Sequence, residues 1–146
     1  AYRRIREDAL HAVGGCSVLV LCGLNCDALC AVKILTYLLR TDHIGYKVKP
    51  VSSYSDIGEV AEREIRGNEE LRSVFLVNCG GVVNLEKYLQ LEGHMNCFVV
   101  DSHRPIHLAN IYADDQIQVF DDDFIDSSLI PSSGDDLSGS LSSSDS

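Results

Sequence analysis

The residues best suited to carry chemistry form the stretch Asp101-Ser102-His103-Arg104-Pro105, which directly follows the apolar run 97–100. An apolar run this short, ended by an acid, a hydroxyl and an imidazole, predicts a buried strand that delivers polar side chains to a sheet edge. A carboxylate and an imidazole can transfer protons or bind a metal ion. This stretch is therefore the first candidate for a functional site.

Two other apolar runs end in the same way. Residues 17–22 lead into Gly23-Leu24-Asn25-Cys26-Asp27, and residues 74–77 lead into Asn78-Cys79-Gly80-Gly81. Ligands of open α/β sheets bind in the crevice beyond the carboxyl ends of the strands. We therefore expect the polar residues that follow the three runs to meet at one edge. These residues are Asn25, Asp27, Asn78, Asp101 and His103.

Hydrophobic periodicity predicts the elements that would position these side chains. Helices are expected over 2–13, 27–41, 55–66 and 84–89, and strands over 17–23, 45–51, 74–77, 96–101 and 116–120. Strands separated by helices imply right-handed crossovers between parallel neighbours. The predicted fold is α/β, with a mostly parallel, doubly wound sheet of about five strands flanked by helices.

Charge is distributed unevenly along the 146 residues, whose formal net charge is -10. Residues 121–146 hold seven Asp and ten Ser, whereas residues 1–120 hold 15 acids against 12 bases. Segment 121–146 is too poor in apolar residues to offset the entropy lost on ordering. We expect one α/β domain over 1–120 and an acidic, disordered Ser/Asp-rich segment over 121–146. The nearly balanced domain neither indicates nor excludes contact with nucleic acid.

The chain contains six cysteines but no C-x-x-C pair, and most of them lie within or beside apolar runs. A reduced thiol in such a place behaves as a small hydrophobe, so we expect core residues rather than disulfides or a zinc site. Neither a signal peptide nor an apolar stretch of about 18 residues is present. The sequence therefore predicts a reducing intracellular compartment and no membrane partner.

Three blocks of the chain together resemble motifs I, II and III of the DHH phosphoesterase superfamily, which includes the RecJ-type nucleases. They are residues 18–35, 75–80 and 99–107. The stretches C-D-A-L-C-A, N-C-G and D-S-H-R-P within them resemble one branch more closely, the cell-division-cycle forty-five family of replication factors. The similarity covers most of residues 15–120, and the acidic segment matches an acidic insertion that such proteins carry. It implies a DHH-like α/β domain.

This chain also departs from the pattern of an active phosphoesterase. Active members hold two divalent metal ions with clustered Asp and His side chains. Asn25 and Asn78 stand where motifs I and II carry Asp, and Ser102 replaces the first His of motif III. The resemblance implies no catalytic residue, no bound metal, no cofactor and a vestigial metal site. Its positions are Asn25, Asp27, Asn78, Asp101, Ser102 and His103.

The resemblance implies a non-catalytic factor in the initiation and elongation of DNA replication. Its partners would be the Mcm ring, the GINS complex and other replication-fork proteins, with single-stranded DNA as a candidate ligand and the nucleus as its location. It would associate with chromatin during replication. Two alternatives remain open. One is an active manganese-dependent single-strand DNA phosphoesterase with further ligands beyond residue 146; the other is an α/β interaction domain without a role in replication.

Simpler structural explanations compete for several of these residues. Asp27 suits the positive end of a helix dipole, Gly80-Gly81 suits a turn, and a loop histidine is more often a surface group than a ligand. In the acidic segment, Ser132, Ser133 and Ser142 each have an Asp three residues later, as acidophilic kinases prefer. They are candidate phosphorylation sites, and a solvated linker is the alternative explanation.

Overall fold

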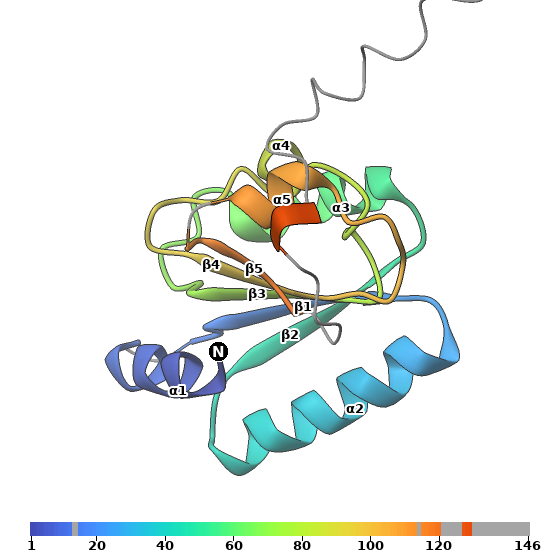
Figure 1. Ribbon diagram of the computed structural model, residues 1–146. Coiled ribbons are helices and arrows are strands. Elements are labelled where there is room, and N and C mark those ends of the chain that lie inside the picture. The colour runs from blue at the N-terminus through green and yellow to red at the C-terminus, as the bar shows by residue number, and fades with distance from the viewer. Residues whose placement is uncertain (13–14, 114, 121–126, 130–146) are drawn as a thin grey trace, which may run out of the picture.

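Five parallel strands form the centre of the molecule, in the order β2-β1-β3-β4-β5 (Figure 1). The computed structural model describes residues 1–12, 15–113, 115–120 and 127–129. The strands are β1 Val18–Gly23, β2 Tyr46–Val51, β3 Ser73–Val77, β4 Asn96–Val100 and β5 Ile117–Val119. Because every neighbouring pair is parallel, all five carboxyl ends lie at the same edge of the sheet.

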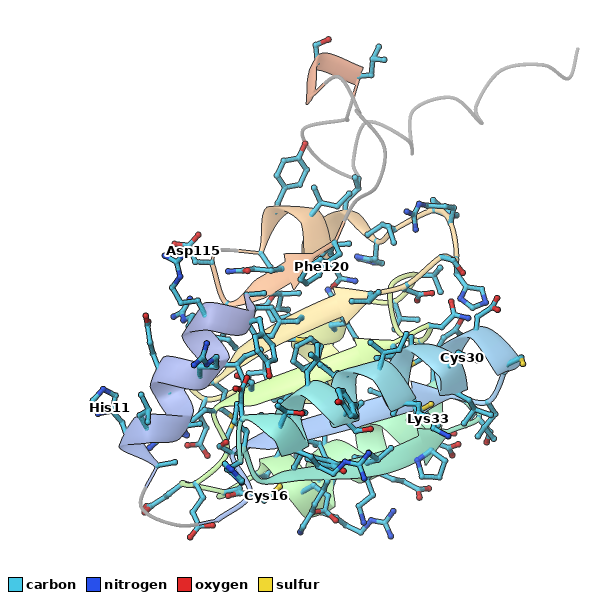
Figure 2. The ribbon with its side chains drawn as sticks, turned by 90° about the horizontal axis from the view of Figure 1, so that it is seen from below. His11, Cys16, Cys30, Lys33, Asp115 and Phe120 are labelled. Atoms are coloured by element: carbon cyan, nitrogen blue, oxygen red, sulfur yellow. The ribbon has the colours of Figure 1, made fainter. Side chains whose placement is uncertain are left out.

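Helices cover both faces of the sheet (Figure 1). They are α1 Tyr2–His11, α2 Cys26–Thr41, α3 Tyr54–Val60, α4 Leu85–Leu89 and α5 Leu108–Tyr112, and α3 continues as a π-helical turn over Ala61–Ile65. Helices α1 and α2 lie on one face, which Figure 2 views directly, and α3, α4 and α5 lie on the other. None of the described helices is both long and apolar enough to span a bilayer.

Side chains of each central strand alternate between two cores. Leu19 and Leu21 of β1 belong to the core beneath α3 and α4, whereas Val18 and Val20 belong to the core beneath α1 and α2. Strands buried on both faces are apolar at every position rather than at alternate positions. This explains why β1 and β3 each appear in the sequence as an unbroken apolar run.

The predicted fold class is confirmed, with differences at the level of elements. The helix expected from residue 55 begins at Tyr54, because the side chain of Ser53 caps it. Helix α5 was not predicted: like α4 it is too short to show a helical period, and its N-cap is His107 rather than an Asn such as the one that caps α4. Segment 121–146 lies outside the described residues apart from Ser127–Leu129, a short 3-10 helix, so its predicted disorder stays a prediction.

Strand order determines where a crevice opens. The chain passes from β1 to β2 on one side and then returns to place β3 on the other side of β1. The two crossovers leave the sheet in opposite directions there, which opens a crevice beyond the carboxyl ends of β1 and β3. Cys22 of β1 pairs with Val77 of β3, and Val77 pairs with Val100 of β4. The residues that follow these three strands are therefore neighbours at the edge.

Candidate functional site

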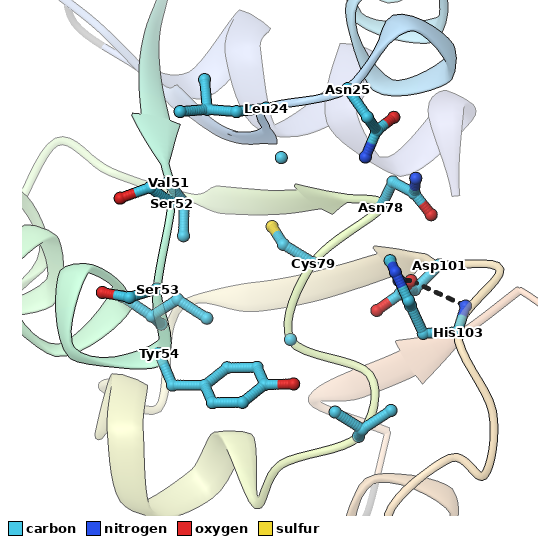
Figure 3. Close-up of a pocket in the computed structure, with 14 residues that line it drawn as sticks. Leu24, Asn25, Val51, Ser52, Ser53, Tyr54, Asn78, Cys79, Asp101 and His103 are labelled. Carbon is cyan, nitrogen blue, oxygen red and sulfur yellow. Dashed lines mark hydrogen bonds and ion pairs between the residues drawn. The ribbon is translucent and has the colours of Figure 1, made fainter.

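A cavity of about 480 Å³ lies at this edge, beyond the ends of β1, β2, β3 and β4 (Figure 3). A second cavity of about 420 Å³ adjoins it, and the two share Asn78 and Asp101 in their walls. Asn25 and His103 line the first, and Asp27 and Ser102 line the second. The structure therefore brings the six predicted positions together around two adjoining cavities rather than in one cluster.

Asp101, directly after β4, is the most deeply buried of the six, with a side chain only 1% exposed. Its Oδ2 accepts a 2.8 Å hydrogen bond from the backbone N–H of Gly81. Its Oδ1 accepts a 3.0 Å bond from the backbone N–H of His103 and lies 2.6 Å from His103 Nδ1. Both carboxylate oxygens are thus occupied by protein donors, which connect the loop after β3 to the loop after β4.

Asn78 follows β3 in the left-handed region, with a φ of 53° that asparagine tolerates better than most residues. Its backbone N–H donates to the carbonyl of Val100 at 2.7 Å. Its Oδ1 accepts from the hydroxyl of Ser102 at 2.7 Å and from the backbone N–H of Ser102 at 3.3 Å. Asn78 and Ser102 therefore form a second connection between the ends of β3 and β4.

Asn25 and Asp27 lie at the start of α2 and differ in their contacts. Asn25 is the N-cap, and its Oδ1 accepts a 2.8 Å bond from the backbone N–H of Ala28. Asp27 is exposed in the first turn of the same helix, and no hydrogen bond or ion pair to another described residue is assigned to it. Its position matches the simpler explanation, a carboxylate at the positive end of a helix dipole.

The donor set does not fit a pair of metal ions. Hard divalent cations are held by carboxylate oxygens, and a catalytic pair needs several of them. In the part of the chain that the structure describes, no group of three or more His, Cys, Asp or Glu side chains is placed to hold a metal. The two remaining acids differ in their role, because both oxygens of Asp101 are already hydrogen-bonded, whereas Asp27 is exposed on the wall of the second cavity.

Cys79 lines the first cavity but is not suited to act as a nucleophile. Burial, and then the charge of Asp101, raise the pKa of its thiol to about 12. Its Sγ donates to the carbonyl of Leu21 at 3.6 Å. A thiolate is the nucleophilic form of cysteine, so a thiol with this pKa is unreactive near neutral pH.

Asn110 is a residue of the site region that sequence reasoning missed. It lies on α5, is 1% exposed, and bonds three backbone groups of the loop between β3 and α4. Its Nδ2 donates to the carbonyls of Gly81 at 3.1 Å and Val83 at 2.7 Å, and its Oδ1 accepts from the N–H of Leu85 at 3.0 Å. A single Asn between apolar residues gave no signal, because its partners are 25 to 29 residues away in sequence.

With this geometry established, comparison with known proteins shows the family. The family model described as CDC45 matches residues 18–142, most of the chain. The chain belongs to the CDC45 family. The resemblance to this family, expected from the stretches C-D-A-L-C-A, N-C-G and D-S-H-R-P, is therefore confirmed.

Two curated relatives illustrate this membership of the CDC45 family. The chain is 40% identical over 129 residues to the cell division control protein 45 homolog of Schizosaccharomyces pombe, and 37% identical over 121 residues to that of Homo sapiens. These matches cover 88% and 81% of this chain but 20% and 21% of the relatives. The chain thus spans about a fifth of the length of these curated CDC45 relatives.

The crystal structure of CDC45 from Entamoeba histolytica is similar in fold. It superposes with a TM-score of 0.73 over 86% of this chain and 24% of that one, at 20% sequence identity. The parallel five-stranded sheet described above is thus shared with a solved CDC45 structure.

Proposed function

We propose that this chain is a non-catalytic α/β module of a DNA replication factor. Membership of the CDC45 family supports the replication role, since the relatives are named cell division control protein 45. The site supports the absence of catalysis, because its residues do not fit a catalytic metal pair. Residues 1–120 would form the folded domain, and residues 121–146 an acidic segment that carries the candidate phosphorylation sites. Ser132, Ser133 and Ser142 lie outside the described residues.

The proposal rests on the hydrogen bonds of the crevice residues, whose side-chain oxygens accept from the protein's own donors. Asp101 accepts hydrogen bonds from the backbone of Gly81 and His103, and Asn78 accepts from Ser102. Asn25 caps a helix. Asn25 and Asn78, which stand where active members carry Asp, each contribute a neutral amide in place of a negative charge. The side-chain oxygen of each accepts a hydrogen bond that stabilises the protein's own backbone or loops. The architecture of a hydrolase edge is retained without the charges that would bind two cations.

We extend the proposal to partners and location by family alone. The module would act within the replicative helicase assembly, where it would bridge the Mcm ring and the GINS complex in the nucleus and associate with chromatin during replication. It would also be able to contact single-stranded DNA. An affinity purification of the endogenous protein from replicating cells tests the assembly role, and Mcm and GINS subunits should be recovered with it. Recovery of neither would favour an interaction domain without a role in replication.

The absence of catalysis is tested with manganese and a single-stranded oligonucleotide. We expect calorimetry to show no tight manganese binding and the oligonucleotide to stay intact. Nuclease activity that disappears in Asp101→Ala would overturn the proposal and favour the RecJ-type phosphoesterase. Activity that is equal in Asp101→Ala and the unaltered chain would come from a contaminant, because Asp101 is central to the crevice, and the proposal would stand.

A further inference from the structure

The crevice presents amide N–H groups where an ion-binding site would present oxygens. Asn25 follows β1 and Asn78 follows β3, on the two sides of the crevice, and both line the cavity of about 480 Å³. We propose that these two amides bind a phosphate group directly, without a metal ion. This goes beyond the assembly role and does not require it.

Backbone donors fix the orientation of both amides. The oxygen of Asn25 accepts from the N–H of Ala28, and the oxygen of Asn78 accepts from the N–H of Ser102. A backbone N–H can only donate, so the atom that faces it in each side chain must be the oxygen. The NH₂ group of Asn25 is then directed away from the first turn of α2, and that of Asn78 away from the loop after β4.

Both NH₂ groups face the same space. Figure 3 shows the nitrogen ends of Asn25 and Asn78 directed toward each other across the crevice. Within the described part of the chain, neither nitrogen has a hydrogen-bond partner, whereas each oxygen has one or more. Two convergent donors from different strands can bind a single oxygen-rich group, such as a phosphate, with one oxygen on each amide.

The charges around this cavity permit an anion. Asp101 is the one carboxylate among the described residues that line it, and both of its oxygens are occupied by Gly81 and His103. Two further acids are near: Asp27 lines the adjoining cavity, and the carboxylate of Asp56 accepts hydrogen bonds from Ser52 and Ser53 of the cavity wall. Asn25 also caps the 16-residue helix α2, whose amino-terminal end carries a partial positive charge. With amides at positions 25 and 78, the crevice carries two fewer negative charges than two carboxylates would give it, and it offers N–H donors to an anion.

The volume of the cavity is in the range of small-molecule sites, so it admits more than an isolated phosphate ion. The bound group would be an inorganic phosphate ion, the phosphate of a nucleotide or a backbone phosphate of single-stranded DNA. These sources share the chemistry that the two amides recognise, and the experiment distinguishes them.

The test uses the side-chain amide signals of the ¹⁵N-labelled 146-residue chain. We expect the Nδ2 signals of Asn25 and Asn78 to shift on addition of a phosphate-containing ligand, and not on addition of sodium chloride at matched ionic strength. Inorganic phosphate, thymidine monophosphate and oligothymidylate without a terminal phosphate are titrated separately. A shift with the oligonucleotide alone identifies the DNA backbone, and a shift with the first two identifies a phosphate monoester or free phosphate.

Matched variants separate binding from folding. Asn25→Asp retains the oxygen that caps α2, and Asn78→Asp retains the acceptor for Ser102 at a φ that Asp tolerates, so both should fold. Each removes one N–H donor and should weaken phosphate binding at least about tenfold. Asn84→Asp, at the N-cap of α4 outside the cavity, should bind like the unaltered chain.

Two results would overturn the inference. One is that all three ligands leave both amide signals unmoved. The other is that Asn25→Asp and Asn78→Asp bind phosphate as tightly as Asn84→Asp. Neither result bears on the assembly role, which is tested by recovery of Mcm and GINS subunits.

Discussion

At the scale of single residues, Asp101 has a structural role that its motif does not reveal. A buried carboxylate is costly unless its oxygens are hydrogen-bonded, and here the donors come from Gly81 and His103. The packing around it is tight, because a Cβ added to Gly81 would lie 2.9 Å from Asp101 Oδ2. Glycine is therefore required at position 81 for close approach, whereas the left-handed backbone of the turn, with a φ of 85°, is that of Gly80.

We expect Asp101→Ala to lower the free energy of unfolding by about 2–3 kcal/mol, because it leaves buried backbone N–H groups without an acceptor. Urea unfolding followed by circular dichroism measures this loss. Asp27→Ala is the matched control, since Asp27 is exposed and its helix-dipole contribution is below about 1 kcal/mol. Equal losses in the two variants would contradict the structural role of Asp101.

At the scale of elements, helix α5 holds the loop between β3 and α4 in place through hydrogen bonds. Asn110 bonds Gly81, Val83 and Leu85, and the backbone N–H of His107 donates to the same Gly81 carbonyl at 2.9 Å. Helix α5 is only five residues long, so these bonds rather than helix propensity fix its position. The loop that forms one wall of the cavity therefore depends on a helix beyond β4.

We expect Asn110→Ala to destabilise the protein by more than about 2 kcal/mol, since several buried backbone groups lose their partner at once. Hydrogen exchange should accelerate most at the amide of Leu85, which donates to Asn110. Asn84→Ala, a partly exposed cap in the same loop, should cost about 1 kcal/mol. Unchanged exchange at Leu85 in Asn110→Ala would show that the loop is held by other contacts.

The start of α3 carries a pH-dependent contribution to stability. Hydrogen bonds from the hydroxyl and backbone N–H of Ser52, and from Ser53, lower the pKa of Asp56 from 3.8 to about 2. A carboxyl group whose pKa is lower in the folded state stabilises the fold above its unfolded pKa. That contribution is lost as the pH falls from about 4 to about 2.

The corresponding experiment compares Asp56→Ala with the unaltered chain across this pH range. The difference in free energy of unfolding should be constant above pH about 5 and should shrink as the pH falls through the window set by the two pKa values. Denaturant titrations at several pH values measure it. A difference that grows toward low pH would have the wrong sign for a carboxylate held by donors.

At the scale of the whole molecule, the cysteines report which parts are inside. All six are free; Cys22 and Cys97 are buried, Cys16 and Cys79 half-buried, and Cys26 and Cys30 exposed on α2. The expectation that the cysteines are core residues therefore holds for the strands but is wrong for Cys26 and Cys30. These two lie on the outer side of α2, where Figure 2 labels Cys30.

We expect Cys26 and Cys30 to react first with Ellman's reagent in the native protein. Cys22 and Cys97 should react only on unfolding, because burial both blocks access and raises the pKa of their thiols. Stopped-flow measurements with Cys26→Ser and Cys30→Ser assign the fast phases. Reaction of Cys97 at the same rate as Cys30 would contradict the packing of β4.

The amino-acid sequence by itself determined the fold class and the location of the candidate site. Unbroken apolar runs at β1, β3 and β4 required strands buried on both faces, and helices between them required parallel crossovers. The polar residues after each run, such as Asn78 and Asp101, then had to lie at the carboxyl edge. These features depend on local pattern and chain connectivity, which the sequence records directly.

Tertiary structure alone decided how those residues are used. Whether Asp101 faces a cation or the N–H of Gly81, and which end of Asn78 faces the cavity, depends on atoms some 20 residues away in sequence. The hydrogen bonds of Asn110 also join segments that are distant in sequence. Tertiary packing likewise decides that Asp27 and His103 line two adjoining cavities. Hydrogen bonds act over about 3 Å, so they are fixed only when packing has brought distant segments into register.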